Sequence, residues 1–184
     1  MENWLIDERM MKALVETLKE GNHSLVIAKP LTAENISSLQ GQQKEETKND
    51  GIEKHCILKF DGRGVSDLFR LLHEEPDVLE GSLLADKVVG KGAAALMALG
   101  KVKEVYADII SQPAFALLEQ EGIQVSYGKL VPHIINRAGT GMCPVETRCQ
   151  PCNTPAECLE EIKKFLKEMK EKKFLEEMKE KQKG

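Results

Sequence analysis

Four cysteines lie close together in sequence near the C-terminus and are well suited to chemistry. Cys143, Cys149, Cys152 and Cys158 form a C-x5-C-x2-C-x5-C series. The spacing of Cys149 and Cys152 is one that zinc ribbons and redox thiols use. Zinc ribbons usually have two close pairs, however, and a helix beginning near Thr154 would carry Cys158 away from the pair. We therefore expect reduced cysteines without a metal, and a structural metal is the alternative.

Cys143 stands directly before a predicted helix that begins at Pro144. The positive end of the helix dipole favours a thiolate, so this thiol is placed to act as a nucleophile. Glu146, in the first turn of the same helix, would be its catalytic partner. His133 is the nearest histidine that could serve as a base, but it falls in a predicted strand. Catalysis by Cys143 and Glu146 is one hypothesis, and a packed or capping thiol is the other.

Lysine and arginine side chains provide a second kind of chemistry, the binding of anions. Lys87 and Lys91 fall within residues 85–99, where alanines and glycines at helical spacing predict a helix buried against a sheet. Because lysines are seldom buried unpaired, both should point at water, an acid or a ligand. Gly62-Arg63-Gly64 precedes another predicted helix and could cradle a phosphate, although a tight turn is the simpler interpretation.

Strand and helix patterns alternate through the chain and provide the framework for these groups. The unit at residues 103–127 reads strand, helix, strand, and its length favours parallel pairing with a right-handed crossover. That pairing predicts a sheet flanked by helices. The predicted strands span residues 24–28, 55–60, 103–110, 123–127 and 131–136, and the predicted helices span residues 1–19, 65–75, 85–99 and 112–121.

Residues 32–54 differ in composition from the segments around them. They are rich in Gln, Glu, Lys, Asn and Ser and have too few apolar groups to offset the entropy of ordering them. We expect an exposed, mobile insertion that joins two neighbouring antiparallel strands. The chain then divides into an N-terminal helix at residues 1–22, a domain at residues 23–162 and a helical tail at residues 163–184.

The tail repeats a segment of nine residues, because residues 164–172 and 173–181 are nearly identical. At about 100° per residue, this repeat turns the second apolar set to the opposite side of the helix. One stripe cannot bury both sets, so we expect a solvated, charged rod rather than a docking helix. A short partner-binding face around Phe174 and Met178 is the alternative, and it would make the tail the working part of the protein.

Composition excludes several classes of protein. The net charge is −4 and aromatic residues make up 4% of the 184 residues, so no surface for nucleic acid is expected. The longest stretch without polar side chains, residues 92–100, is far shorter than the roughly 20 residues of a membrane-spanning helix. The first helix mixes acids and bases and does not resemble a signal peptide. An odd number of cysteines then favours reduced thiols in a cytoplasmic protein.

The order of three motifs resembles an uncharacterised prokaryotic family. The motifs are Asp61-Gly-Arg-Gly-Val65, Ala85-Asp-Lys-Val-Val-Gly-Lys91 and Asn136-Arg-Ala-Gly-Thr-Gly-Met-Cys-Pro-Val-Glu146. The family is the domain of unknown function eighteen ninety-three, and the resemblance runs from residue 24 to residue 161. This family is grouped with the cytidine-deaminase-like superfamily. The resemblance implies an α/β fold, a three-layer α/β/α sandwich with a mixed sheet, to which this chain adds an N-terminal helix and the charged tail.

Zinc deaminases hold their metal through an H-x-E pattern on one helix and P-C-x-x-C on the next. By chain order the first helix start would fall at Ala85-Asp86-Lys87 and the second at Pro113-Ala-Phe-Ala-Leu117. Neither has an imidazole or a thiol that could ligate zinc. We expect no catalytic zinc and no other cofactor.

The resemblance instead places other polar residues near the sheet end where deaminases bind their base. Two lysines and an arginine, with the exposed amides of the helix at Pro144, would suit a phosphate or a carboxylate. The structural interpretation pairs Asp86 with a lysine and makes Glu146 a capping-box acid. The expected ligand-binding residues are Arg63, Asp86, Lys87, Lys91, Asn136, Arg137 and Cys143.

These expectations favour a binding or regulatory domain for a small anionic or nucleotide-like ligand. The alternatives are a zinc-independent enzyme that uses Cys143 and a structural or partner-binding protein. No nucleic acid or membrane partner is expected, and self-association as a homo-oligomer stays open.

Overall fold

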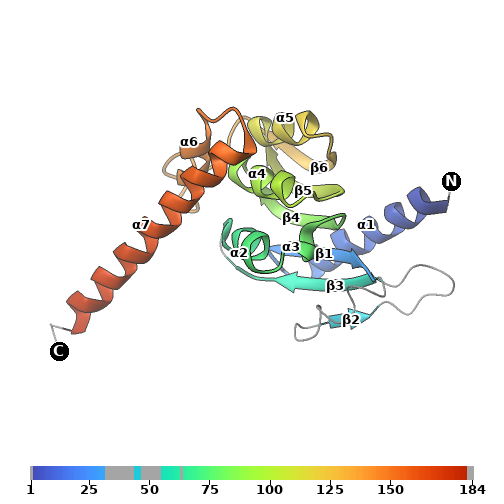
Figure 1. Cartoon of the computed structure of the whole chain (residues 1–184), viewed down its shortest axis with the longest axis horizontal. Coiled ribbons are helices and arrows are strands. Elements are labelled where there is room, and N and C mark those ends of the chain that lie inside the picture. Colours follow the sequence, from blue (N-terminus) through green and yellow to red (C-terminus); the bar gives the residue numbers. More distant parts are fainter. Residues whose placement is uncertain (1, 32–43, 47–54, 63, 182–184) are drawn as a thin grey trace.

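A mixed β-sheet forms the centre of the protein (Figure 1). The computed structural model describes residues 2–31, 44–46, 55–62 and 64–181. The strands of this part are β1 (Leu25–Pro30), β2 (Lys44–Glu46), β3 (His55–Phe60), β4 (Leu83–Val89), β5 (Glu104–Ser111) and β6 (Gln124–Val131). Its helices are α1 (Glu2–Glu20), α2 (Ser66–Glu74), α3 (Pro76–Leu79), α4 (Lys91–Leu99), α5 (Gln112–Gln120), α6 (Pro144–Cys149) and α7 (Pro155–Lys181).

The strands lie in the order β2-β3-β1-β4-β5-β6. Strands β4, β5 and β6 are parallel, whereas β1 is antiparallel to both of its neighbours, β3 and β4. The prediction that strands 24–28 and 55–60 are antiparallel neighbours is therefore confirmed, as is the parallel pairing within residues 103–127. Strand β4 lies at the boundary between the antiparallel and parallel halves, with its carboxyl end beside the amino end of β1.

Helices cover both faces of the sheet. On one face, α1 packs Leu14 and Leu18 against Val26 of β1 and Ala85 of β4. The opposite face contacts α2, α4 and α5, which bury the larger of the two cores. Neighbouring residues of β1 belong to different cores because successive side chains of a strand point to opposite faces. The expected mixed sheet with flanking helices is confirmed, including the helices near both ends of the chain.

Residues 85–99 form a strand followed by a helix, so the prediction of one helix over this segment is wrong. Strand β4 supplies residues 83–89, and α4 begins only at Lys91. Gly90, in an extended conformation, separates the two. A buried strand is apolar on both faces, and over a few residues its pattern cannot be distinguished from that of a buried helix. Asp86 and Lys87 consequently lie on a strand.

Two other predictions concern segments beside the sheet. The prediction of a strand at residues 131–136 is wrong, because β6 ends at Val131 and the following loop makes an isolated bridge between Ile135 and Met142. Of the predicted insertion at residues 32–54, the structure describes only β2, which pairs with β3. The other residues of the insertion lie outside the described part.

Helix α7 extends away from the body of the protein (Figure 1). Its first turns are packed, and Cys158 and Ile162 are completely buried. Farther along, Phe174 is 62% exposed and Leu175 is 57% exposed. This exposure agrees with the interpretation of the second repeat as a solvated rod. Among the described residues, no helix combines the length and apolar character required to cross a membrane.

Candidate functional site

A pocket of about 360 Å³ opens where the carboxyl end of β4 meets the first turn of α4. The start of β1, the turn after β3 and the loop before α6 complete its walls. In open α/β sheets, ligands bind outside the carboxyl ends of strands where the strand order changes direction. The polar residues that line it are Ser24, Asp67, Asp86, Lys87, Asn136, Arg137, Cys143 and Glu146.

Glu146 connects α6 to α4 at the bottom of this pocket. Its Oε2 atom accepts a hydrogen bond from the backbone N–H of Lys91 at 2.7 Å, at the beginning of α4. The side chain is 3% exposed, and its Oε1 atom is buried without a hydrogen-bond partner in the described part of the chain. A Cβ atom at residue 90 would lie 2.5 Å from Oε2, so glycine there permits the approach. Glu146 is therefore not a capping-box acid of its own helix.

Asp86 is a second buried carboxyl group in the pocket wall. Its Oδ1 atom accepts a hydrogen bond from the backbone N–H of Val88 at 2.9 Å. Burial raises its pKa to about 7, and the neighbouring charge of Asp67 acts in the same direction. The predicted ion pair between Asp86 and a lysine is wrong for the residues described, because both candidate lysines bond to other groups.

Lys87 and Lys91 have different surroundings. The Nζ atom of Lys87 donates to the backbone and side-chain oxygens of Asn22, and the residue lines the pocket. The Nζ atom of Lys91 instead donates to the carbonyl oxygens of Cys152, at 2.6 Å, and Gln150, at 3.1 Å. Lys91 is absent from the pocket lining, so its side chain binds the end of α6 rather than facing the pocket.

Asn136 and Arg137 reach the pocket from the loop before α6. Asn136 Oδ1 accepts a hydrogen bond from the Thr140 backbone N–H at 3.1 Å, which closes this loop on itself. Gly139 has a φ of +68°, a left-handed conformation that glycine adopts easily. Arg137 is exposed, so its guanidinium belongs to the rim of the pocket. Arg63 lies outside the described residues.

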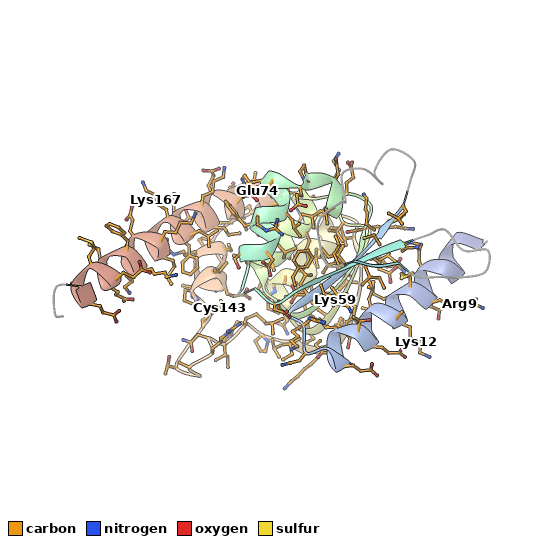
Figure 2. The ribbon with its side chains drawn as sticks, turned by 90° about the horizontal axis from the view of Figure 1, so that it is seen from below. Arg9, Lys12, Lys59, Glu74, Cys143 and Lys167 are labelled. Atoms are coloured by element: carbon orange, nitrogen blue, oxygen red, sulfur yellow. The ribbon has the colours of Figure 1, made fainter. Side chains whose placement is uncertain are left out.

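Cys143 occupies the N-cap position of α6 (Figure 2), although its thiol makes no capping hydrogen bond to the described residues. It is half-buried and lines the pocket. His133, the predicted base, is exposed and does not line the pocket. Within the described part of the chain, no histidine belongs to the lining. The geometry therefore places Cys143 and Glu146 at one site but provides no imidazole to activate the thiol.

Asp67 and the apolar wall of the pocket were not predicted from the sequence. Asp67 Oδ2 accepts a hydrogen bond from the backbone N–H of Gly62 at 2.8 Å. Asp67 is an acid in the first turn of a helix that follows a glycine-rich turn, and this sequence signal could have predicted its contact with the turn. Ile134 reaches the pocket through tertiary contacts and lies outside the three motifs, whereas Val88 lies within the second motif but was not expected to line a site.

The residues at the helix starts do not fit a deaminase zinc site. Helix α4 begins at Gly90-Lys91, not at Ala85 as expected, and its first amide is bound by Glu146. Helix α5 begins after Ser111, which caps it by accepting a hydrogen bond from the Ala114 amide. Neither start has a thiol or an imidazole. Over the described ranges, no group of three His, Cys, Asp or Glu side chains is arranged to hold a metal ion.

A model of the domain of unknown function DUF1893 matches residues 46–166, which include this whole pocket apart from the start of β1. The chain belongs to the DUF1893 family. The crystal structure of a DUF1893 family protein from Thermotoga maritima is similar, with a TM-score of 0.64 and 23% sequence identity. The match covers 84% of this chain and 88% of the other. At this identity the likeness shows the fold alone, and no curated protein matches the sequence.

Proposed function

We propose that this DUF1893 protein binds a small nucleotide-like ligand in the pocket between β4, α4 and α6, as a binding or regulatory domain without catalytic zinc. The observation that carries the proposal is the buried carboxyl group of Glu146, whose Oε1 atom has no hydrogen-bond donor among the described residues. A buried acceptor without a donor is costly, and a ligand that supplies an N–H group would remove that cost.

Carboxyl groups make the interior of the pocket suitable for hydrogen-bond donors. Asp67, Asp86 and Glu146 all line it, and an anionic group placed among them would be repelled. The ring N–H and amino groups of a nucleobase are neutral donors that such a wall would accept. This charge distribution favours a nucleobase over a simple phosphate or carboxylate as the group that enters the pocket.

Cationic groups lie where an anionic part of the same ligand would emerge. Arg137 is exposed at the rim, and the Lys87 ammonium lies at the start of β1. A phosphate attached to the base would bind there, because arginine forms charge-assisted hydrogen bonds with phosphate oxygens. A base inside and a phosphate outside together define a nucleotide-like molecule. The cytidine-deaminase-like sandwich that the resemblance implies would suit this choice of ligand.

Calorimetric titration of the full-length protein with nucleosides, their monophosphates and inorganic phosphate tests the proposal. We expect nucleotides to bind most tightly, nucleosides more weakly and phosphate least. Glu146→Gln should weaken both nucleoside and nucleotide binding by about 10- to 100-fold, since a hydrogen bond to a charged group contributes about 1.5–3 kcal/mol. The amide of the variant can still accept the Lys91 N–H.

Two matched variants separate the interior of the pocket from its rim. Glu176→Gln removes an exposed carboxylate from α7 and should leave every affinity unchanged. Arg137→Gln should weaken nucleotide binding while sparing nucleosides. Equal affinity for phosphate and nucleotides, together with no effect of Glu146→Gln, would show that the site binds only anions and would reject the proposal.

A further inference from the structure

The two edges of the described sheet are built very differently. At one edge lies β2, which has three residues, all of them charged. At the other edge lies β6, which has eight residues and a single charge, that of Lys129 (Figure 1). Short edge strands and charged side chains are two means by which proteins keep an edge from pairing with another chain. The β2 edge has both means of protection, whereas β6 is long and nearly uncharged.

Strand β6 is open along its whole length. None of its eight residues is buried, and in the described part of the chain its backbone pairs only with β5. Its register with β5 keeps the same offset from Gln124 to Val131, so no β-bulge bends it away, and the strand contains no proline. Because only alternate N–H and C=O groups can bond to β5, the others face outward without a partner among the described residues.

Apolar side chains flank this open edge. Tyr127 is 42% exposed and Leu130 is 37% exposed, and Ile109 of the neighbouring strand is as exposed as Leu130. The Tyr127 ring meets the half-buried Phe115 ring of α5 edge-on, with 5.5 Å between the ring centroids. Aromatic side chains are enriched at protein interfaces. The edge therefore offers both unpaired backbone groups and an apolar surface beside them.

The charges around β6 favour one kind of partner. Glu119 and Glu121 are exposed and precede the strand, whereas Lys129 is exposed and lies near its end. A second copy that runs antiparallel brings each Lys129 toward the two acids of the other copy, which is favourable. A parallel copy would instead place each lysine opposite its counterpart, and like charges directly opposite destabilise strand pairing. The edge is thus complementary to a reversed copy of itself.

We propose that two copies of this chain associate through β6, paired antiparallel about a two-fold axis near Tyr127 and Gly128. The two six-stranded sheets then form one continuous sheet. Because both copies use the same edge, the contact closes at the dimer and leaves no open β6. Among the described residues, none that lines the pocket belongs to β5 or β6, so dimer formation requires no ligand and is independent of the proposed function.

Light scattering after size exclusion, on the full-length wild-type protein over a range of concentrations, tests the association. We expect a mass twice that of the 20.5 kDa chain, falling to that of one chain on dilution. Hydrogen exchange of single amides then locates the contact. In the dimer every amide of β6 should be protected, whereas in the monomer alternate amides should exchange faster. The amides of β5, which is paired on both sides, should stay protected at each concentration.

Two lysine substitutions at exposed leucines provide matched variants. Leu130→Lys adds a charge to the β6 edge and should raise the dissociation constant of the dimer by about 10- to 100-fold. Its side chain is exposed in the single chain, so the thermal unfolding midpoint of the monomer should stay close to the wild-type value. Leu175→Lys adds the same charge at an exposed site on α7 and should leave the dissociation constant unchanged.

Three results would overturn the proposal, and two of them come from the wild-type protein alone. The first is a chain that stays monomeric at every concentration, with alternate β6 amides exchanging fast. The second is a dimer in which these amides exchange as fast as in the monomer. The third is a dimer that Leu175→Lys dissociates and Leu130→Lys preserves, which would place the interface on α7.

Discussion

Asp86 is the residue whose protonation links the pocket to folding. Its pKa is raised to about 7 in the folded protein, compared with 3.8 for an ordinary aspartate. Between these two values the folded state holds a proton that the unfolded state has lost, so stability must fall as pH rises through this window. Above pH 7 both states are ionised, and the full cost of burying the charge remains.

Replacing this carboxyl group should remove the pH dependence. We expect Asp86→Asn to match the wild type near pH 4 and to exceed its unfolding free energy by about 2–4 kcal/mol above pH 7. The amide oxygen can still accept the Val88 N–H. Denaturant titrations at several pH values measure the difference. An exposed carboxylate serves as the control, and Asp77→Asn should change stability by less than about 0.5 kcal/mol at each pH.

At the scale of elements, the two ends of α7 have different roles. Ile162 is completely buried against α4 and α6, and Arg148 of α6 forms an ion pair with Glu168 of α7. Lys167, labelled in Figure 2, marks the region where α7 leaves the body of the protein. The first half of the helix is therefore part of the core, whereas the second half is a solvated extension.

This division predicts unequal effects of similar truncations along one helix. Ile162→Ala should lower the unfolding free energy by about 2–5 kcal/mol, because it removes a fully buried side chain and leaves a cavity. Leu175→Ala, at a site that is 57% exposed, should change it by less than about 0.5 kcal/mol. Urea denaturation compares the two variants. A large loss of stability on changing Leu175 would mean that a second copy of the chain buries the end of α7.

For the whole molecule, the pocket and the tail are separate units of structure. The pocket is built from β1, the turn after β3, α2, β4, α4, α6 and the loop before α6, and among the described residues none of its lining belongs to α7. Helix α7 touches the site indirectly, because its first turn lies over α6, which carries Glu146.

Removing the exposed half of α7 should therefore leave both folding and ligand binding intact. A chain that ends after Lys170 keeps Ile162 and the Arg148–Glu168 ion pair. We expect its thermal unfolding midpoint to lie within about 2 °C of the full-length value. Its nucleotide affinity should also be unchanged. Loss of self-association on truncation, measured by light scattering, would instead assign the tail to contacts between chains.

The sequence by itself determined the elements whose signals are local. The helix starts at residue 112 and near Thr154 were predicted, and in the structure the Ser111 and Thr154 hydroxyls accept hydrogen bonds from amides only three residues away. Strands β1, β3 and β5 were predicted from their apolar runs, and α1 was predicted from the helical spacing of its apolar residues. These signals are also local. The motifs also contain most of the polar residues of the pocket, and the structure brings Asp86, Asn136 and Cys143 together in one lining.

Only the tertiary structure decided what those residues contact. Glu146 reaches the amide of Lys91 across 55 positions of sequence, and the Lys91 side chain bonds to the end of α6. The identity of β4 depended on neighbouring strands that hydrogen-bond to it from both sides. Burial, charge and hydrogen-bond satisfaction depend on elements that the fold brings together. Local periodicity carries no information on these contacts, which is why the open acceptor of Glu146 emerged only in three dimensions.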